Sequence, residues 1–430
     1  MCRGQQKPQG LTVRRFPGAF FFTGLENKYM IPLKKIQQAA ACIKEHVIDT
    51  PLLYSPDLSQ MFGGEIYLKL ENLQRTGSFK IRGATYKLIQ RRKQIGSGGV
   101  VAASAGNHAQ GVALAAKQAG LTATIVMPEW VSITKQEATR IYGGNVVICG
   151  RNIGESLAEA TRLAAAGKFF LHPFDDLDII AGQGTVGLEI FNALEKPDLI
   201  VVPVGGGGLI SGIASVTKAL SPATRITGVQ AAACPSAYEA LLNGRVREVE
   251  GQSSIADGIS VKKIGSRNFA IMKTSVDNVV LVEEEQIVAA MLLLLERKKI
   301  LVEGSGAAPM AAVMSGAVKL PKNGKTVLVV SGGNVDSPLL GRIVSQGLVK
   351  NGRVMRIQVR MTDVPGSLSK LLELVAASKA NVLHIYHDRG ARGTPIYVTH
   401  VELELETRGA RHIRQIEKNL TFAGYEFKTR

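Results

Sequence analysis

Short apolar runs alternate with amphipathic stretches along most of the chain from Met30 onward. The runs at residues 100–104 and 199–204 are continuously apolar, as expected of strands buried on both faces of a parallel sheet. Each run is followed by a segment with the apolar spacing of a helix. This alternation predicts an α/β protein built of strand-helix units, with residues of about 99–176 forming a small subdomain inserted in a larger one.

The pattern changes near residues 349–352, where Val349-Lys350-Asn351-Gly352 has the composition of a linker. Beyond it the pattern predicts strands at 353–361, 380–387 and 396–406, helices at 368–378 and 410–423, and a closing strand at 425–428. We therefore expect a catalytic region at 30–345, a linker at 346–352 and a compact α+β domain at 353–430.

Composition narrows the class of protein. The chain has 430 residues, of which 45% are hydrophobic, and this length predicts two or three domains. The formal net charge of +17 leaves a basic nucleic-acid-binding protein as a distant alternative. Because the basic residues are spread along the chain with no run of five, we expect a solvated basic surface and no nucleic-acid partner.

The cysteines and the N-terminal residues indicate in which cellular compartment the protein is expected. The four cysteines are widely spaced and form no disulfide framework, which favours a reducing, cytoplasmic location. Residues 1–29 are basic and hold a short apolar run interrupted by Pro17 and Gly18, which predicts a disordered extension and no signal peptide. No apolar stretch approaches the length of a membrane span, so we expect no membrane partner.

Lys80 is the first candidate for covalent chemistry. It lies in Gly77-Ser78-Phe79-Lys80-Ile81-Arg82-Gly83-Ala84, between a strand-like segment at 66–71 and a helix-like one. With Ser78 as the N-cap, Lys80 falls in the first helical turn, beside free N–H groups and the positive end of the helix dipole. This position disfavours the ammonium form, so it favours a neutral amine that forms an imine with an aldehyde and later acts as a base.

Four consecutive glycines form a second candidate site. Gly205-Gly206-Gly207-Gly208-Leu209 lies between the strand at 199–204 and a predicted helix at 210–220. Glycine lets the backbone approach a ligand closely, and the N–H groups at a helix start bind phosphate. A flexible linker is the alternative, but linkers are rarely framed by a buried strand and a helix.

Four motifs in this order resemble the threonine/serine dehydratase family over about residues 32–345. The motifs are Gly77-Ser78-Phe79-Lys80, Ser104-Ala105-Gly106-Asn107-His108, Gly205-Gly206-Gly207-Gly208-Leu209 and Ser331-Gly332-Gly333-Asn334. The resemblance implies pyridoxal 5'-phosphate as cofactor, bound on the type II fold between two αβα subdomains with mostly parallel sheets. The terminal region is similar to the ACT domain, a small α+β module that senses amino acids.

The resemblance also implies a role for each motif residue. Lys80 would be the catalytic Schiff-base lysine. The other cofactor-binding residues would be Phe79 against the ring, Asn107 at the 3′-oxygen, Gly205, Gly206, Gly207, Gly208 and Leu209 at the phosphate, Gly258 near the ring, and Ser331 at the pyridine nitrogen. The substrate carboxylate would be received by Ser104, Ala105, Asn107 and His108. We expect no metal, because the segment after the strand at 226–230 lacks the carboxylates of cation-binding relatives.

These roles predict a threonine ammonia-lyase that eliminates water from an amino-acid substrate, converting L-threonine to 2-oxobutanoate and ammonia and L-serine to pyruvate. Serine racemase and serine or 3-hydroxyaspartate dehydratase are the nearer alternatives. Racemases of this type carry serine where this chain has Ala105, whose methyl group donates no proton. Elimination is therefore the favoured reaction.

For the terminal domain, two interpretations stay open. Its loop could bind an amino-acid effector through Asp363, Pro365, Gly366, Ser367 and Leu368, or the domain could serve dimerisation alone. In either case we expect a homo-oligomer, a dimer or a tetramer.

Overall fold

A computed structural model describes residues 29–389 and 395–429 of the chain. The chain divides after Val335 into a larger N-terminal unit and a smaller C-terminal unit. The predicted N-terminal extension lies, in its residues 1–28, outside the described residues. Among the described helices, none combines the length and the apolar character needed to cross a membrane.

A six-stranded sheet forms the centre of the N-terminal unit, and all its pairings are parallel except that of the edge strand β1 with β2. In sheet order the strands are β1 (Leu52–Tyr54), β2 (Glu65–Leu70), β10 (Lys325–Val330), β7 (Leu199–Pro203), β8 (Arg225–Ala231) and β9 (Asn278–Val282). Strand β7 is buried at every position, which explains its continuous apolar sequence.

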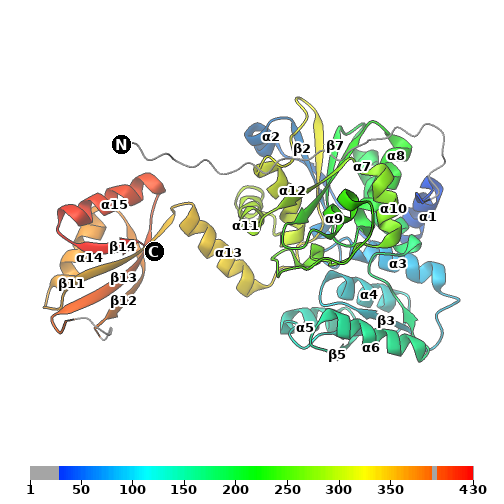
Figure 1. The fold of residues 1–430 in the computed structure, drawn as a ribbon, viewed down its shortest axis with the longest axis horizontal. Helices are drawn as coiled ribbons and strands as arrows, with labels where there is room; N and C mark the ends of the chain where they lie inside the picture. Colours follow the sequence, from blue (N-terminus) through cyan, green and yellow to red (C-terminus); the bar gives the residue numbers. More distant parts are fainter. Residues whose placement is uncertain (1–28, 390–394, 430) are drawn as a thin grey trace. The chain divides into compact units, whose positions relative to one another are not determined.

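Helices cover both faces of this sheet (Figure 1). The helices are α1 (Leu33–Ile43), α2 (Pro56–Phe62), α3 (Lys80–Arg91), α7 (Leu177–Ala193), α8 (Gly208–Leu220), α9 (Ser236–Asn243), α10 (Ser266–Ser275), α11 (Glu284–Leu293) and α12 (Gly304–Met314), with the short turns η1 (Glu71–Leu73), η2 (Asp257–Ile259) and η3 (Leu294–Lys298). Helix α12 packs on β7 to β10, and α11 packs on α12. Helices α7, α8 and α10 stack on one another along the opposite face.

A second sheet of four parallel strands forms the small subdomain within this unit. Its order is β5 (Gly144–Ile148), β4 (Ala123–Met127), β3 (Val100–Ala103) and β6 (Phe169–Phe170), with helices α4 (Asn107–Gln118), α5 (Ile133–Ile141) and α6 (Ile153–Ala165). The predicted α/β class with two αβα subdomains is confirmed. Three of the sequence motifs follow the carboxyl ends of β3, β7 and β10, the edge at which α/β sheets bind ligands.

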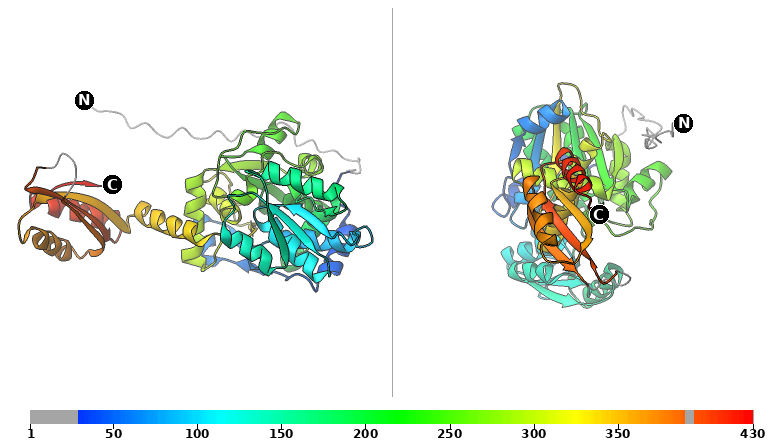
Figure 2. Two further views of the ribbon diagram at one scale, coloured as in Figure 1. Left: turned by 90° about the horizontal axis from the view of Figure 1, so that it is seen from below. Right: turned by 90° about the vertical axis from the view of Figure 1, so that its left-hand side faces the viewer.

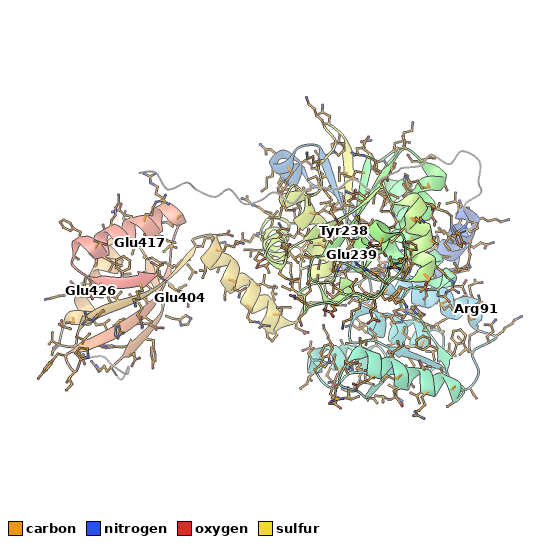
Figure 3. The ribbon with its side chains drawn as sticks, viewed as in Figure 1. Arg91, Tyr238, Glu239, Glu404, Glu417 and Glu426 are labelled. Atoms are coloured by element: carbon orange, nitrogen blue, oxygen red, sulfur yellow. The ribbon has the colours of Figure 1, made fainter. Side chains whose placement is uncertain are left out.

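The C-terminal unit is an antiparallel sheet covered by two helices on one face (Figures 1 and 2). Its elements are α13 (Ser337–Lys350), β11 (Val354–Thr362), α14 (Ser367–Ala377), β12 (Asn381–Asp388), β13 (Val398–Glu406), α15 (Ala410–Phe422) and β14 (Glu426–Thr429), and the sheet order is β12-β13-β11-β14. Alternate residues of β11 and β13 pack in one cluster with α14 and α15. The opposite face is polar and carries the ion pairs Arg356–Glu404 and Arg360–Glu426, each at 2.9 Å. Figure 3 labels the two glutamates of these pairs.

The predicted order of elements in this unit agrees with the structure, but the predicted linker differs from it. Residues 346–350 belong to α13, which lies within the C-terminal unit, so the division falls about ten residues before the expected linker. Asn351 is the C-cap of α13, and Gly352 follows with φ +65°. The Asn-Gly pair that resembled a linker is thus a helix-ending signal.

Candidate active site

Lys80 is the first residue of α3, so its predicted place in the first helical turn is confirmed. Its Nζ donates a hydrogen bond to the carbonyl of Pro173 at 3.3 Å and lies 5.3 Å from the centre of the Phe79 ring. Burial lowers the pKa of Lys80 to about 8, against an opposing attraction from Glu303. A neutral amine is therefore within reach near neutral pH, as imine formation requires.

The predicted capping role of Ser78 is wrong. Phe79 occupies the N-cap position of α3, and no side chain caps this helix. The backbone of Ser78 instead pairs with Gly332, and its buried hydroxyl has no partner among the described residues. This long-range pairing holds the segment before Lys80 against the Ser331–Asn334 turn, where the carbonyl of Ser331 accepts from the N–H of Phe79 at 3.2 Å.

Asn107 is held from both ends of its side-chain amide. Its Oδ1 accepts from Nδ2 of Asn334 at 2.7 Å, and its Nδ2 donates to Oε1 of Glu303 at 2.7 Å. Glu303 is the buried N-cap residue of α12. Burial, with a smaller contribution from Asp257, raises the pKa of Glu303 to about 8.

Sequence reasoning assigned no role to Glu303. A lone acid before a glycine-rich helix start ordinarily reads as a surface group or a cap. A Cβ at Gly332 would overlap Oε1 of Glu303, so the glycine of the Ser331–Asn334 motif makes room for this contact. The need for glycine at position 332 could have pointed to Glu303, but this relation can be recognised only once the fold places the two residues side by side.

The glycine loop forms a cradle of free backbone donors at the start of α8. No described residue accepts a hydrogen bond from the N–H groups of Gly206, Gly207, Gly208 or Leu209. Gly207 has φ +94°, a conformation that favours glycine. Buried N–H groups without partners at a helix start fit a phosphate group.

Gly258 lies beside this loop, because a Cβ at Gly205 would be 3.0 Å from the Gly258 carbonyl. A Cβ at Gly258 would in turn be 2.8 Å from Oγ of Ser305, a buried hydroxyl without a partner in the described part of the chain. Ser331 follows β10 and is also buried. The structure thus brings Gly258 close to Gly205, and holds Ser331 next to Phe79.

The residues expected to receive the substrate carboxylate follow β3 as one turn into α4. Oγ of Ser104 accepts from the N–H of Gly106 at 3.2 Å. The His108 ring is buried and its Nε2 lies 3.2 Å from the carbonyl of Leu171. Burial, and then the charge of Lys80, lowers the pKa of His108 to about 3, so its ring is neutral. The carboxylate-binding role of this turn, Ala105 included, stays a prediction.

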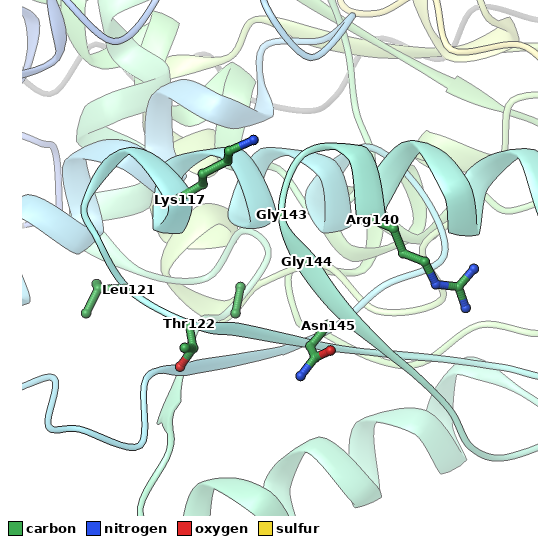
Figure 4. Close-up of a pocket in the computed structure, with 8 residues that line it drawn as sticks. Lys117, Leu121, Thr122, Arg140, Gly143, Gly144 and Asn145 are labelled. Carbon is green, nitrogen blue, oxygen red and sulfur yellow. The ribbon is translucent and has the colours of Figure 1, made fainter.

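A cavity of about 440 Å³ lies elsewhere in the small subdomain (Figure 4). It is lined by Lys117, Leu121, Thr122, Ala123, Arg140, Gly143, Gly144 and Asn145. Lys117 and Arg140 come from α4 and α5, and the other residues lie at or just before the amino ends of β4 and β5, the edge opposite to the motif turns. None of the expected site residues lines it. Within the described residues, no group of three or more His, Cys, Asp or Glu could hold a metal ion.

A partly buried lysine with a lowered pKa and a cradle of free N–H groups suit a cofactor that carries both an aldehyde and a phosphate. Lys80 would hold the aldehyde carbon, and the loop from Gly206 to Leu209 would hold the phosphate. The chain belongs to the family of pyridoxal-phosphate dependent enzymes, whose family model matches residues 43–332.

Individual relatives indicate which members of this family the chain is similar to in sequence and fold. The chain is 47% identical to an L-threonine ammonia-lyase of Thermotoga maritima over 401 residues, which cover 93% of this chain and 99% of that one. Among solved structures, the processed form of threonine deaminase isoform 2 from Solanum lycopersicum is 33% identical, covers 80% of this chain and 98% of its own, and superposes with a TM-score of 0.70. Maize serine racemase is 33% identical, covers 75% and 100%, and has a TM-score of 0.70.

Proposed function

We propose that this protein is a threonine ammonia-lyase, which converts L-threonine to 2-oxobutanoate and ammonia and also takes L-serine to pyruvate. The observation that carries the proposal is the partly buried amine of Lys80 at the start of α3, with its lowered pKa. A relative that is 47% identical over 93% of this chain, and that is named an L-threonine ammonia-lyase, supports the choice of substrate.

The bound cofactor supplies an electron sink for the bond between Cα and its hydrogen. Lys80, once released from the cofactor, would take the proton from Cα, because its neutral form is accessible near neutral pH. Ser331 would face the ring nitrogen, and a serine hydroxyl does not hold that nitrogen protonated as a carboxylate would. This arrangement favours prompt elimination of the β-hydroxyl over a long-lived carbanion.

Racemisation of serine is the second candidate reaction, favoured by the similarity to serine racemase. It needs an acid on the face of the substrate opposite to Lys80. Ala105 stands in the turn between β3 and α4, where racemases of this type carry a serine, and its methyl group cannot return a proton. This substitution supports elimination. Measuring D-serine beside pyruvate with L-serine as substrate separates the two reactions.

The test of the proposed function is keto-acid production from L-threonine and L-serine by the full-length protein. Lys80→Ala should lower the rate by about a thousandfold or more and abolish the visible absorbance of the lysine-bound cofactor. Lys93→Ala is the matched control, because Lys93 is exposed just beyond α3. A Lys80→Ala protein with wild-type turnover would refute the assignment.

We extend the proposal to an amino-acid effector site in the C-terminal unit. A cavity of about 390 Å³ there is lined by the expected residues Asp363, Pro365, Gly366, Ser367 and Leu368. Arg389 also lines it and pairs with Asp363 at 3.0 Å, and Nε2 of His387 is buried with no partner among the described residues. A carboxylate and a guanidinium in one cavity match the two charged ends of a free amino acid.

Calorimetric titration of the full-length protein with isoleucine, valine and threonine tests this extension, with Asp363→Ala as the variant that should lose binding. Absence of heat with all three amino acids would leave the domain as a dimerisation unit.

Light scattering tests the expected homo-oligomer, a dimer or a tetramer. We propose a cytoplasmic location, which the cysteines support, because the three that the structure describes, Cys42, Cys149 and Cys234, are free.

A further inference from the structure

The carbonyl of Gly206 determines which way the cradle faces. In a trans peptide the C=O and the following N–H point in opposite directions, so the Gly206 carbonyl and the Gly207 N–H lie on opposite sides of the loop. The carbonyl points into the protein, where it accepts from the N–H of Gly265 at 3.1 Å and from Nδ2 of Asn268 at 2.8 Å. The Gly207 N–H is thereby turned away from these donors, toward the open side of the cradle.

Asn268 stands in the first turn of α10 and is completely buried. Its Nδ2 donates to the carbonyls of Gly206 and of Phe174, the latter at 3.1 Å. Its Oδ1 is buried with no partner in the described part of the chain. Leaving the oxygen of a buried amide without a hydrogen bond destabilises the protein. Such an amide is therefore expected where the hydrogen bonds donated by its nitrogen have a function.

Phe174 is the second segment that this amide holds. A Cβ at Gly206 would overlap Cγ of Phe174, so the aromatic ring lies directly on the glycine loop. The turn that carries Phe174 is anchored to α10 a second time, because the carboxylate of Asp175 accepts from the N–H groups of Ser266 and Arg267. One side-chain amide therefore connects the loop with the ring that covers it.

We propose that Asn268 is a positioning residue for the cofactor: by holding the carbonyl of Gly206 inward, it presents the N–H groups of the glycine loop to the phosphate. Asn268 bonds directly to the loop at the phosphate end of the cofactor, whereas it is linked to Lys80 only indirectly, because Nζ of Lys80 donates to the carbonyl of Pro173, the residue before Phe174. We therefore expect the larger effect of Asn268 at the phosphate end. The inference rests on the proposed assignment of the Gly206–Leu209 loop to that phosphate.

The experiment compares two ligands of the full-length chain depleted of cofactor. Pyridoxal phosphate engages both Lys80 and the loop, whereas pyridoxal engages Lys80 without a phosphate. Asn268→Ala should weaken pyridoxal phosphate about tenfold, equivalent to 1.4 kcal/mol, because the Gly206 carbonyl keeps its bond from Gly265. Pyridoxal should bind within about twofold of wild type.

Asn268→Asp supplies a second measurement at unchanged side-chain volume. An ionised carboxylate only accepts hydrogen bonds, whereas its protonated form donates one. Relative to wild type at each pH, this variant should bind pyridoxal phosphate weakly at high pH and recover as the pH falls. A ratio to wild type that is independent of pH would overturn the inference even if Asn268→Ala does not fold.

Met272→Leu is the matched control. Met272 lies on the same helix and its Sδ would be 3.3 Å from a Cβ at Gly207, yet it makes no hydrogen bond to the loop. It should bind both ligands as wild type does. Equal weakening of both ligands in Asn268→Ala would overturn the positioning role and leave the proposed function intact. Failure of the wild-type protein to bind either ligand covalently would overturn both.

Discussion

A buried network of four charges next to Lys80 offers the most quantitative test of the fold that holds the site. Arg82 and Glu71 are completely buried, and the guanidinium meets the carboxylate through two hydrogen bonds of 2.8 Å. Arg82 also bonds to Glu189, which in turn accepts from the buried ammonium of Lys69. The network holds two positive and two negative groups, so it is neutral as a whole.

Glu71→Gln removes one negative charge from this network and leaves a net positive charge in the protein interior. Burial alone would raise the pKa of Glu71, but Arg82 outweighs it and holds the pKa below its usual range, so the carboxylate is ionised in the native protein. Breaking one side of a buried ion pair costs about 3–5 kcal/mol. Since Arg82 keeps its bonds to Glu189 and glutamine retains one acceptor, we expect about 3 kcal/mol.

Urea unfolding of the full-length protein, followed by circular dichroism, measures this loss as a shift of the midpoint. Glu137→Gln is the matched control, because Glu137 pairs with Arg140 on the surface, where both side chains are about half exposed, and its loss should cost less than about 1 kcal/mol. Replacing both partners, in Glu71→Leu with Arg82→Met, should cost less than Glu71→Gln. A Glu71→Gln midpoint equal to that of the surface control would refute the reasoning.

Three further predictions concern the site. The raised pKa of Glu303, about 8, means that the native state keeps a proton which the unfolded chain releases near pH 4.5. The contribution of this proton to stability is complete below about pH 4.5 and is lost as the pH rises through 8. The urea midpoint of Glu303→Gln should therefore fall less over this pH range than the midpoint of wild type, and parallel curves would contradict the raised pKa. Gly206→Ala should weaken cofactor binding more than about tenfold, because the new methyl group meets the ring of Phe174. Phe174→Ala should restore part of that affinity, since Gly206 itself has no positive φ, and a double variant no better than the single one would exclude this clash. Ala105→Ser should form D-serine slowly from L-serine, as measured by chiral chromatography. If no D-serine forms, the missing hydroxyl at position 105 does not by itself explain why elimination is preferred over racemisation.

Much of the site was predictable because its signals are local. The start of α3 at Lys80, the glycine loop before α8 and the turn into α4 each depend on residues a few positions apart, which decide helix starts and the conformations open to glycine. The two wrong predictions, the capping role of Ser78 and the linker at Asn351-Gly352, also came from local sequence signals. Ser78 has the side chain of an N-cap, but a backbone pairing with Gly332, more than two hundred residues away, takes it out of that position. Asn351 and Gly352 read as a linker because a helix-ending signal and a linker share the same residues.

The sequence by itself therefore determined the fold class, the cofactor and the motif residues, because alternating strands and helices and phosphate-binding turns are written in short stretches. Only the tertiary structure decided what surrounds those motifs. Asn107 meets Glu303 across 196 residues of sequence, and Asn268 meets Gly206 across 62. Such contacts arise from the packing of whole sheets and helices, which brings segments together at distances that no periodicity along the chain can encode.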